Sequence, residues 1–175
     1  MCHLPTNSPQ SPSCYKVTKL IIKQFRRLKN QTIPIGPHIT LIAGQNGTSK
    51  STLLGLIAHP FSCKKDTNSV YVRHYKNIDL DSIRTINNKK FESDYTQMFR
   101  FSNIHDLPGN HEYSICIEGP DLLDPQGLSE FGIPIKSKIR NATKQKIRLV
   151  AGKTHETGEG NFPHPIIYLG LGRLA

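Results

Sequence analysis

The stretch Gly44-Gln45-Asn46-Gly47-Thr48-Ser49-Lys50-Ser51-Thr52 decides the fold that we expect for this 175-residue chain. It lies between two apolar segments of different kinds. Residues 38–43 have the β-branched and apolar composition of a buried strand, and residues 51–58 read as a helix that ends before Pro60. A strand, a glycine-rich loop and a helix therefore follow one another in the order that a phosphate-binding loop requires.

The chemistry of such a loop comes mainly from its backbone. Successive N–H groups point inward, and the N-terminus of the helix adds about half a positive charge, so main-chain groups hold a polyphosphate. We expect Lys50 to reach the β- and γ-phosphates and the hydroxyl of Ser51 to ligate Mg²⁺. The residues assigned to nucleotide binding are Gly44, Asn46, Gly47, Thr48, Ser49, Lys50, Ser51 and Thr52.

The loop departs from the pattern G-x-x-x-x-G-K-[ST] at one position, where Ser49 stands in place of the glycine before Lys50. Serine keeps the N–H donor but adds a Cβ atom where the backbone passes close to phosphate. If Ser49 has an ordinary helical φ, the effect on binding is small. If it needs φ > 0, the affinity for nucleotide falls. The alternative interpretation is a chance Gly/Ser turn.

Composition and charge limit the class of protein. A chain of this length forms one domain or part of a larger one. No apolar run approaches the ~20 residues that span a bilayer and the first segment is no signal peptide, which predicts a soluble cytoplasmic protein. The four cysteines lack metal-ligand spacing and are expected to be reduced thiols. The net charge of +10, with no acidic residue before Asp66, favours nucleic acid or nucleotide as a ligand.

The chain starts with a polar leader and then changes to a strand pattern. Residues 1–14 are rich in Pro, Ser and Asn and are predicted to be disordered. From Tyr15 onward, the apolar pattern predicts two strands joined by a basic turn, with Ile33 and Ile35 on the core face. Gly36-Pro37 then turns the chain into residues 38–43.

Residues 17–58 also carry a family resemblance, through the segments 19–28, 33–35, 39–47 and 50–54. Together they resemble the N-terminal head segment of SMC/RecF/SbcC-type ATPases of the ABC class. The resemblance implies an α/β P-loop NTPase core, partial in this chain, with an antiparallel β subdomain, so that residues 15–175 form the N-terminal part of a P-loop ATPase domain. It also implies ATP and Mg²⁺ as cofactors, ATP hydrolysis, head-to-head dimerisation around nucleotide, and often work on DNA in repair, replication or defence.

Three later segments are candidates for strands of the antiparallel subdomain: residues 69–74, 97–101 and 111–117, the last after a turn at residues 108–110. The resembling family has a glutamine after the loop helix that contacts Mg²⁺ and the attacking water. Gln97 is the candidate for this role, with an ordinary surface glutamine as the alternative.

Two basic strands are expected at residues 135–140 and 144–150, joined by a turn at Asn141-Ala142. A strand repeat of two residues places three bases on one face of each strand. One interpretation is the solvated face of a hairpin, and the other is a surface that contacts DNA phosphates. The basic residues concerned are Lys136, Lys138, Arg140, Lys144, Lys146 and Arg148.

The last segment, residues 165–175, is almost continuously apolar, which predicts a buried parallel strand and further sequence beyond it. The chain contains no run of four apolar residues followed by an acid, which is the motif that holds Mg²⁺ through water. It also lacks the Ser- and Gly-rich signature loop that the resembling family has before a helix. We therefore assign no catalytic residue and expect hydrolysis only in a protein that supplies these motifs. The alternatives are a non-catalytic nucleic-acid-binding module and an inactive truncated remnant.

Overall fold

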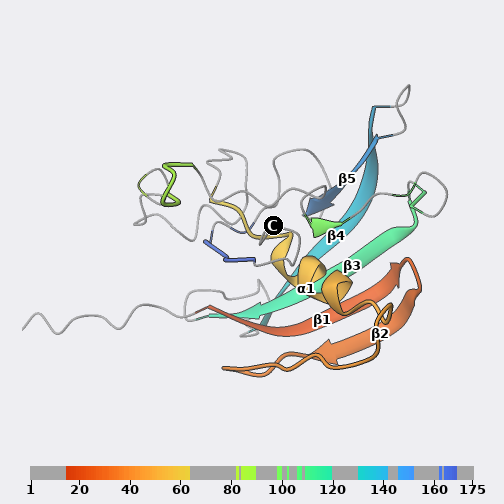
Figure 1. The fold of residues 1–175 in the computed structure, drawn as a ribbon, viewed down its shortest axis with the longest axis horizontal. Coiled ribbons are helices and arrows are strands. Elements are labelled where there is room, and N and C mark those ends of the chain that lie inside the picture. Colours follow the sequence, from red (N-terminus) through yellow and green to blue (C-terminus); the bar gives the residue numbers. More distant parts are fainter. Residues whose placement is uncertain are drawn as a thin grey trace, which may run out of the picture.

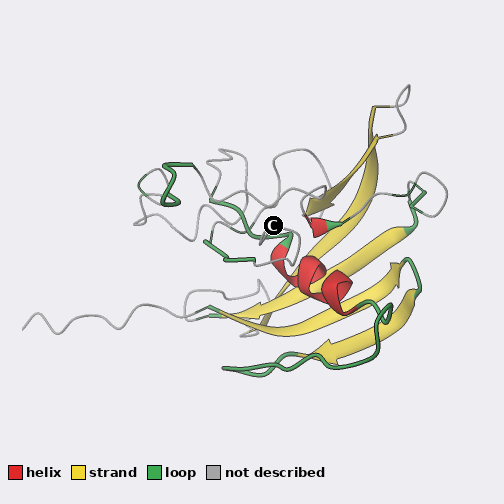
Figure 2. Ribbon diagram, viewed as in Figure 1, coloured by secondary structure: helices red, strands yellow, loops and turns green. Residues whose placement is uncertain are grey.

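The computed structural model describes residues 15–63, 82, 84–89, 98–99, 102, 106–107, 109–119, 130–141, 146–151, 162 and 164–168. Their main feature is an antiparallel sheet of strand order β2-β1-β3-β4-β5 with one helix against it (Figures 1 and 2). The elements are β1 (Lys16–Phe25), β2 (Leu28–Pro34), α1 (Lys50–Ala58), β3 (His111–Glu118), β4 (Glu130–Asn141) and β5 (Lys146–Ala151).

The first two strands form the predicted hairpin with a basic turn. Phe25 pairs with Leu28, so Arg26 and Arg27 alone connect β1 to β2. Leu20 and Ile22 of β1 are buried while Ile21 between them is exposed, as the strand repeat of two residues requires. Ile33 packs against the core as predicted. Ile35 lies just beyond β2 and is half-buried.

The centre of the sheet is the pairing of β1 with β3. Leu20 lies opposite Ile115, and Val17 lies opposite Ile117. The predicted turn before β3 is present, with Gly109 at φ +87°, a conformation that glycine adopts without strain. Beyond β3, the chain pairs Ile115 with Ile133 of β4, which extends one apolar face across three strands.

Helix α1 covers this apolar face. Leu56 is fully buried and joins one hydrophobic cluster with residues of β1, β3 and β4, and Figure 1 shows the helix lying across these strands. The helix begins at Lys50, one residue before the predicted start, and ends at Ala58 as predicted. The helix is short, and most of its stability comes from packing against the sheet.

The predicted strand at residues 38–43 is wrong for this structure. Residues 35–45 contain no strand, and Ile39 and Leu41 are each 88% exposed. The backbone N–H of Gly36 donates to the Thr40 hydroxyl at 2.8 Å, so the chain bends back on itself here. An apolar pattern forms a strand only beside a neighbour that accepts its hydrogen bonds, and no described strand flanks this segment. The described strands thus form the antiparallel subdomain, without parallel core strands.

The buried strand predicted at residues 165–175 is also not found in the part of it that the structure describes, residues 165–168. Residues 164–168 contain no strand, and Ile167 is 77% exposed. Nearby, Phe162 makes a short parallel bridge with Phe61. Of the segment 97–101, Met98 and Phe99 are not in a strand, and Phe99 is buried in the core. The leader at 1–14, the segment 69–74 and Gln97 lie outside the described residues.

Burial of His59, at the C-terminal end of α1, predicts a pH-dependent stability. Burial lowers the pKa of His59 to about 4, while an unfolded histidine titrates near 6.5. The unfolded chain therefore binds more protons below pH 6.5, and stability is lost as the pH falls from there toward 4. We expect His59→Phe to remove about 2 kcal/mol of the fall in unfolding free energy between pH 7.5 and pH 5.

Urea unfolding at the two pH values measures this difference. His38→Gln, at an exposed position, is the control and should behave as the wild type. An unchanged pH dependence in His59→Phe would show that this histidine is not buried in neutral form.

Candidate functional site

The loop before α1 has a defined backbone shape. Gly47 has φ +81°, and the Thr48 hydroxyl donates to the Gln45 carbonyl at 2.7 Å. A Cβ atom on Gly44 would lie 2.9 Å from that hydroxyl oxygen, which is too close. Glycine is thus required at position 44 by the turn of the loop, and at 47 by its left-handed φ.

The ammonium group of Lys50 lies inside this loop. Its Nζ donates to the carbonyl oxygens of Gly44 and Gln45, both at 2.6 Å. Lys50 is also the first residue of α1, so the positive charge stands beside the backbone N–H groups of the first helical turn. No side chain caps these groups, and the first turn has no acidic residue. The arrangement favours a negatively charged ligand.

Ser49 adopts the conformation that the motif pattern reserves for glycine. Its φ is +66° and its ψ is 18°, in the left-handed region, and its side chain makes no capping hydrogen bond. A left-handed conformation costs a residue with a Cβ atom about 1–2 kcal/mol. Ser49 therefore has the positive φ and not the ordinary helical φ, and the serine strains the loop.

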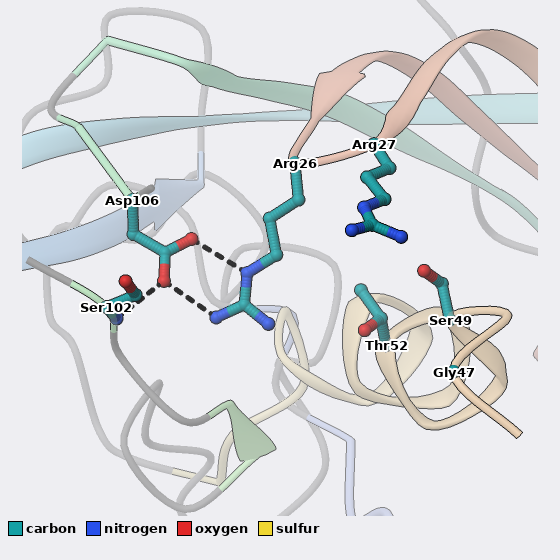
Figure 3. A pocket seen from close by; sticks show the side chains of 7 residues that line it. All are labelled: Arg26, Arg27, Gly47, Ser49, Thr52, Ser102 and Asp106. Atoms are coloured by element: carbon teal, nitrogen blue, oxygen red, sulfur yellow. Dashed lines mark hydrogen bonds and ion pairs between the residues drawn. The ribbon is translucent and has the colours of Figure 1, made fainter. Parts of the chain in front are cut away.

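A cavity of about 480 Å³ lies between this loop and the β1–β2 turn (Figure 3). One wall comes from the loop and the start of α1, and the other comes from the two arginines of the turn. Figure 3 shows Arg27 directed toward Ser49 and Thr52 across the cavity. The lining residues are Arg26, Arg27, Gly47, Ser49, Thr52, Ser102 and Asp106.

A carboxylate forms the far wall of the cavity. Asp106 has a side chain that is 0% exposed and accepts hydrogen bonds from Arg26 Nε at 2.7 Å and from a second guanidinium nitrogen at 2.8 Å. The backbone N–H of Ser102 donates to it at 2.8 Å. Burial alone would raise the pKa of Asp106, but Arg26 and the Ser102 N–H together hold it below its ordinary value. The carboxyl group is therefore ionised at neutral pH.

His111 completes this cluster from β3. Its Nε2 lies 3.2 Å from Asp106 Oδ1. Burial is the main reason that the pKa of His111 lies below its ordinary value, although Asp106 acts in the opposite direction. Because an ionised carboxylate only accepts hydrogen bonds, Nε2 carries the proton of the neutral ring. Its Nδ1 is buried without a hydrogen-bond partner among the described residues.

Sequence reasoning found the loop but not the opposite wall of the cavity. The aromatic-basic turn at residues 25–28 was part of the resemblance, and this was the one signal that pointed to Arg26 and Arg27. No sequence signal pointed to Ser102 or Asp106, since their role depends on long-range contact. Asn46 is exposed in the turn of the loop, and Ser51 is exposed on the first turn of α1.

The two basic strands are present as β4 and β5, but Asn141, predicted in the turn, is the last residue of β4 and pairs with Lys146 at the start of β5. Lys138 lies opposite Arg148 in the pairing of β4 with β5. Lys136 is exposed, and its Nζ lies 3.6 Å from a carboxylate oxygen of Glu112, which also pairs with Lys23 at 3.1 Å. The position of Lys144 and the side chains of Arg140, Lys146 and Arg148 lie outside the description.

The described part of the chain shows no metal centre and no membrane span. No group of three or more His, Cys, Asp or Glu side chains gathers there as metal ligands. Cys63 and Cys116 are buried and form no disulfide bond, in line with the predicted reduced thiols, and burial raises the pKa of Cys63. None of the described helices has the length and apolar character needed to cross a membrane.

Comparison with known protein families assigns the class. The family model of the AAA ATPase domain matches residues 16–159. The chain therefore belongs to the AAA ATPase domain family. This confirms the predicted P-loop ATPase class and its nucleotide-binding function, and it indicates use of ATP and Mg²⁺. No curated protein and no solved structure gives a significant match to the chain.

The contact between α1 and the residues behind the cavity gives a test of the packing. A Cβ atom on Gly55 would lie 2.8 Å and 2.9 Å from two ring carbons of Phe99. Alanine favours a helix by about 0.5–1 kcal/mol over glycine, but overpacking costs about 1–3 kcal/mol. We expect Gly55→Ala to lower the unfolding free energy, as measured by urea denaturation.

The double variant Gly55→Ala/Phe99→Leu is the matched control, because the smaller side chain makes room for the new methyl group. The alanine should cost less in the Phe99→Leu background than in the wild type. A stabilising Gly55→Ala would contradict the close packing of the helix.

Proposed function

We propose that residues 44–52 bind Mg²⁺-ATP and that the chain is the nucleotide-binding part of an SMC/RecF-like ATPase. The observation that carries this proposal is the position of Lys50. Its ammonium group is held by two carbonyls of its own loop at the uncapped N-terminus of α1, and the preceding residue, Ser49, lines a cavity together with Arg27. Such a concentration of positive charge suits a triphosphate.

The residues fit the groups of a nucleotide. The loop offers backbone N–H donors, and a Cβ atom on Gly47 would meet no atom within 4 Å, so this side of the loop is open to a ligand. Arg27 approaches from the opposite wall and adds a second cation for phosphate oxygens (Figure 3). Among the described residues, no acid pairs with Arg27 in an ion pair.

Ser51 is the residue that we assign to Mg²⁺. Its hydroxyl is exposed on the first turn of α1, next to Lys50. Mg²⁺ takes oxygen ligands and keeps several waters, so one hydroxyl together with nucleotide oxygens is a suitable donor set. When bound, the ion would neutralise charge on the phosphates. Gln97 remains a prediction for a second contact.

Binding is expected without efficient hydrolysis. Phosphoryl transfer to water needs an acid for Mg²⁺ and a group that orients the water. Of the described residues that line the cavity, Asp106 is the acid, and its two oxygens are engaged by Arg26, Ser102 and His111. The sequence has no run of four apolar residues followed by an acid, and the nearest match, residues 115–118, has three. Hydrolysis would therefore use motifs supplied from elsewhere.

The SMC/RecF-like assignment is supported by the order of the elements. A hairpin with an aromatic-basic turn precedes the loop and α1, and the later strands complete an antiparallel sheet beside them. Pairing of two heads around nucleotide, action on DNA in repair or defence, and a cytoplasmic location rest on the resemblance and on composition, and they stay predictions.

Replacement of Lys50 tests the function. We expect the wild type to bind a non-hydrolysable ATP analogue in the presence of Mg²⁺ and Lys50→Ala to lose at least ~10-fold in affinity, because a charge-assisted contact is worth about 1.5–3 kcal/mol. Isothermal titration calorimetry measures both. The exposed Lys29→Ala, on β2, is the charge-matched control. Equal affinity in Lys50→Ala and the wild type would refute the site.

Turnover is measured on the same samples. A rate near ~1 s⁻¹, which is ordinary for an enzyme, would show that the chain holds a catalytic acid after all.

A second candidate function is binding of nucleic acid through the outer face of the sheet. The register of Lys138 opposite Arg148 and the exposure of Lys23 and Lys136 favour it. Glu112 weakens it, because this acid lies between two of the lysines. This candidate predicts DNA binding that decreases steeply with salt and that neither ATP nor Lys50→Ala changes, so the Lys50 variant separates the two functions.

The strain at Ser49 predicts a gain of affinity by substitution. Ser49→Gly removes the Cβ atom at φ +66°, so a larger fraction of molecules should hold the binding conformation. We expect the dissociation constant for the ATP analogue to fall about fivefold to thirtyfold, which corresponds to a strain of about 1–2 kcal/mol.

Ser49→Ala separates the two possible causes. It removes the hydroxyl but keeps the strained backbone, and it should bind like the wild type. If alanine and glycine improve binding equally, the hydroxyl and not the backbone is responsible.

A further inference from the structure

We propose that Asp106 is a positioning residue of the nucleotide site: by holding Arg26 in the β1–β2 turn, it keeps the neighbouring Arg27 directed at the phosphate-binding loop. The inference rests on the proposed binding of a nucleotide at this loop. It adds a residue that lies more than fifty positions further along the sequence from the loop and that acts on nucleotide binding through the turn.

The backbone of the β1–β2 turn is strained and needs a stabilising contact from outside the turn. A two-residue connection between antiparallel strands needs positive φ, which glycine and asparagine adopt most readily. Here Arg26 takes φ +54°, a conformation that costs an ordinary residue about 1–2 kcal/mol. Since Arg27 follows directly, the backbone of Arg26 sets the direction in which the Arg27 side chain leaves the turn.

Asp106 supplies this stabilising contact. The carboxylate takes both hydrogen bonds of a fork from the Arg26 guanidinium, at 2.7 Å and 2.8 Å, a geometry that fixes orientation as well as distance. The guanidinium carbon also lies 5.8 Å from the centre of the Phe25 ring and 5.9 Å from that of Phe99. Arg26 is thus held in place by one buried acid and two aromatic rings.

Asp106 is in turn fixed by groups that the nucleotide does not touch. The Ser102 N–H and the His111 ring both donate to it, and its side chain is fully buried. Through His111 the carboxylate is tied to β3, and through Phe99 the cluster packs against Gly55 of α1. The two walls of the cavity are therefore held at a set distance from each other.

The consequence falls on Arg27. This side chain is exposed, and Figure 3 shows it directed at Ser49 and Thr52. A long arginine side chain loses rotamer freedom when it is held in one place. A fixed turn limits the directions open to it, so less freedom is lost when it contacts phosphate.

The test is a double-mutant cycle on the full chain, with the non-hydrolysable ATP analogue as the probe. Asp106→Asn keeps the size of the side chain but loses the charge, and we expect a twofold to tenfold loss of affinity, the usual range for coupled neighbours. In the Arg27→Ala background, the same substitution should have little further effect, because the residue through which Asp106 acts is gone. Glu112→Gln, at an exposed ion pair, is the control and should bind like the wild type.

Other outcomes overturn the proposal. Equal losses in both backgrounds would mean that Asp106 acts on the stability of the whole domain. Tighter binding by Asp106→Asn would mean that the carboxylate withholds Arg26 from the phosphates. If the wild type binds and Lys50→Ala does not, while Asp106→Asn binds normally, this inference fails and the proposed function stands. If the wild type itself does not bind, the proposed function fails.

Arg26→Lys keeps the proposal testable if Asp106→Asn does not fold. Lysine leaves a cation beside the buried carboxylate but cannot form the fork. We expect a smaller loss of affinity in the same direction, again absent in the Arg27→Ala background. Thermal unfolding of each variant is measured in parallel, and a loss of affinity by Arg26→Lys that persists without Arg27 would reject the role.

Discussion

The close contact between Gly55 of α1 and the ring of Phe99 is the constraint on which the arrangement of helix, sheet and cavity depends. It leaves no room for a side chain at position 55. The helix therefore lies closer to Phe99, and through it to Phe25 of β1, than an alanine would allow. Because the phosphate-binding loop is the direct continuation of α1 toward the N-terminus, the same contact also fixes how far the loop stands from the β1–β2 turn.

The charged residues around the cavity form two groups, one paired and one without acidic partners. Behind the cavity, a buried acid is neutralised by Arg26 and hydrogen-bonded on all sides, so it acts as part of the framework. In front of it stand Lys50 and Arg27, which have no acidic partner among the described side chains. A protein gains little stability from such unpaired cations, since they repel one another. Arg27 lines the cavity and Lys50 directly follows the lining residue Ser49, an arrangement that suits a polyanion.

Local patterns in the sequence predicted what local physics controls. The repeat of apolar residues and the positions of glycine and proline predicted β1, β3, the turn at Gly109 and helix α1. The structure has these elements within a residue or two of the predicted bounds. The loop residues were found because a glycine pattern between an apolar segment and a helix is rare by chance. The sequence left open whether Ser49 takes a positive φ, and the structure answers this with φ +66°.

Features that depend on a partner far along the chain could not be read in this way. Ile39 and Leu41 have the pattern of a strand, but a strand forms only beside another one, and none flanks them among the described residues. Asp106 is one carboxylate in a polar stretch, and of its three partners Ser102 and His111 are close in sequence while Arg26 is 80 residues away. In both cases the missing information is a pairing between distant segments, which periodicity does not contain.

The pairing of β1 with β3 has a consequence for how the domain folds. It joins segments far apart in the chain, with Thr18 bonded to the carbonyl of Cys116, 98 residues away. Residues 44–52 and α1 both lie in the segment between β1 and β3, and the pairing of these strands brings the two ends of that segment together. Closing such a long loop is slow, because its entropy is lost before the contacts form. We therefore expect residues 44–58 to reach their final position later in folding than the β1–β2 hairpin, whose contacts are local.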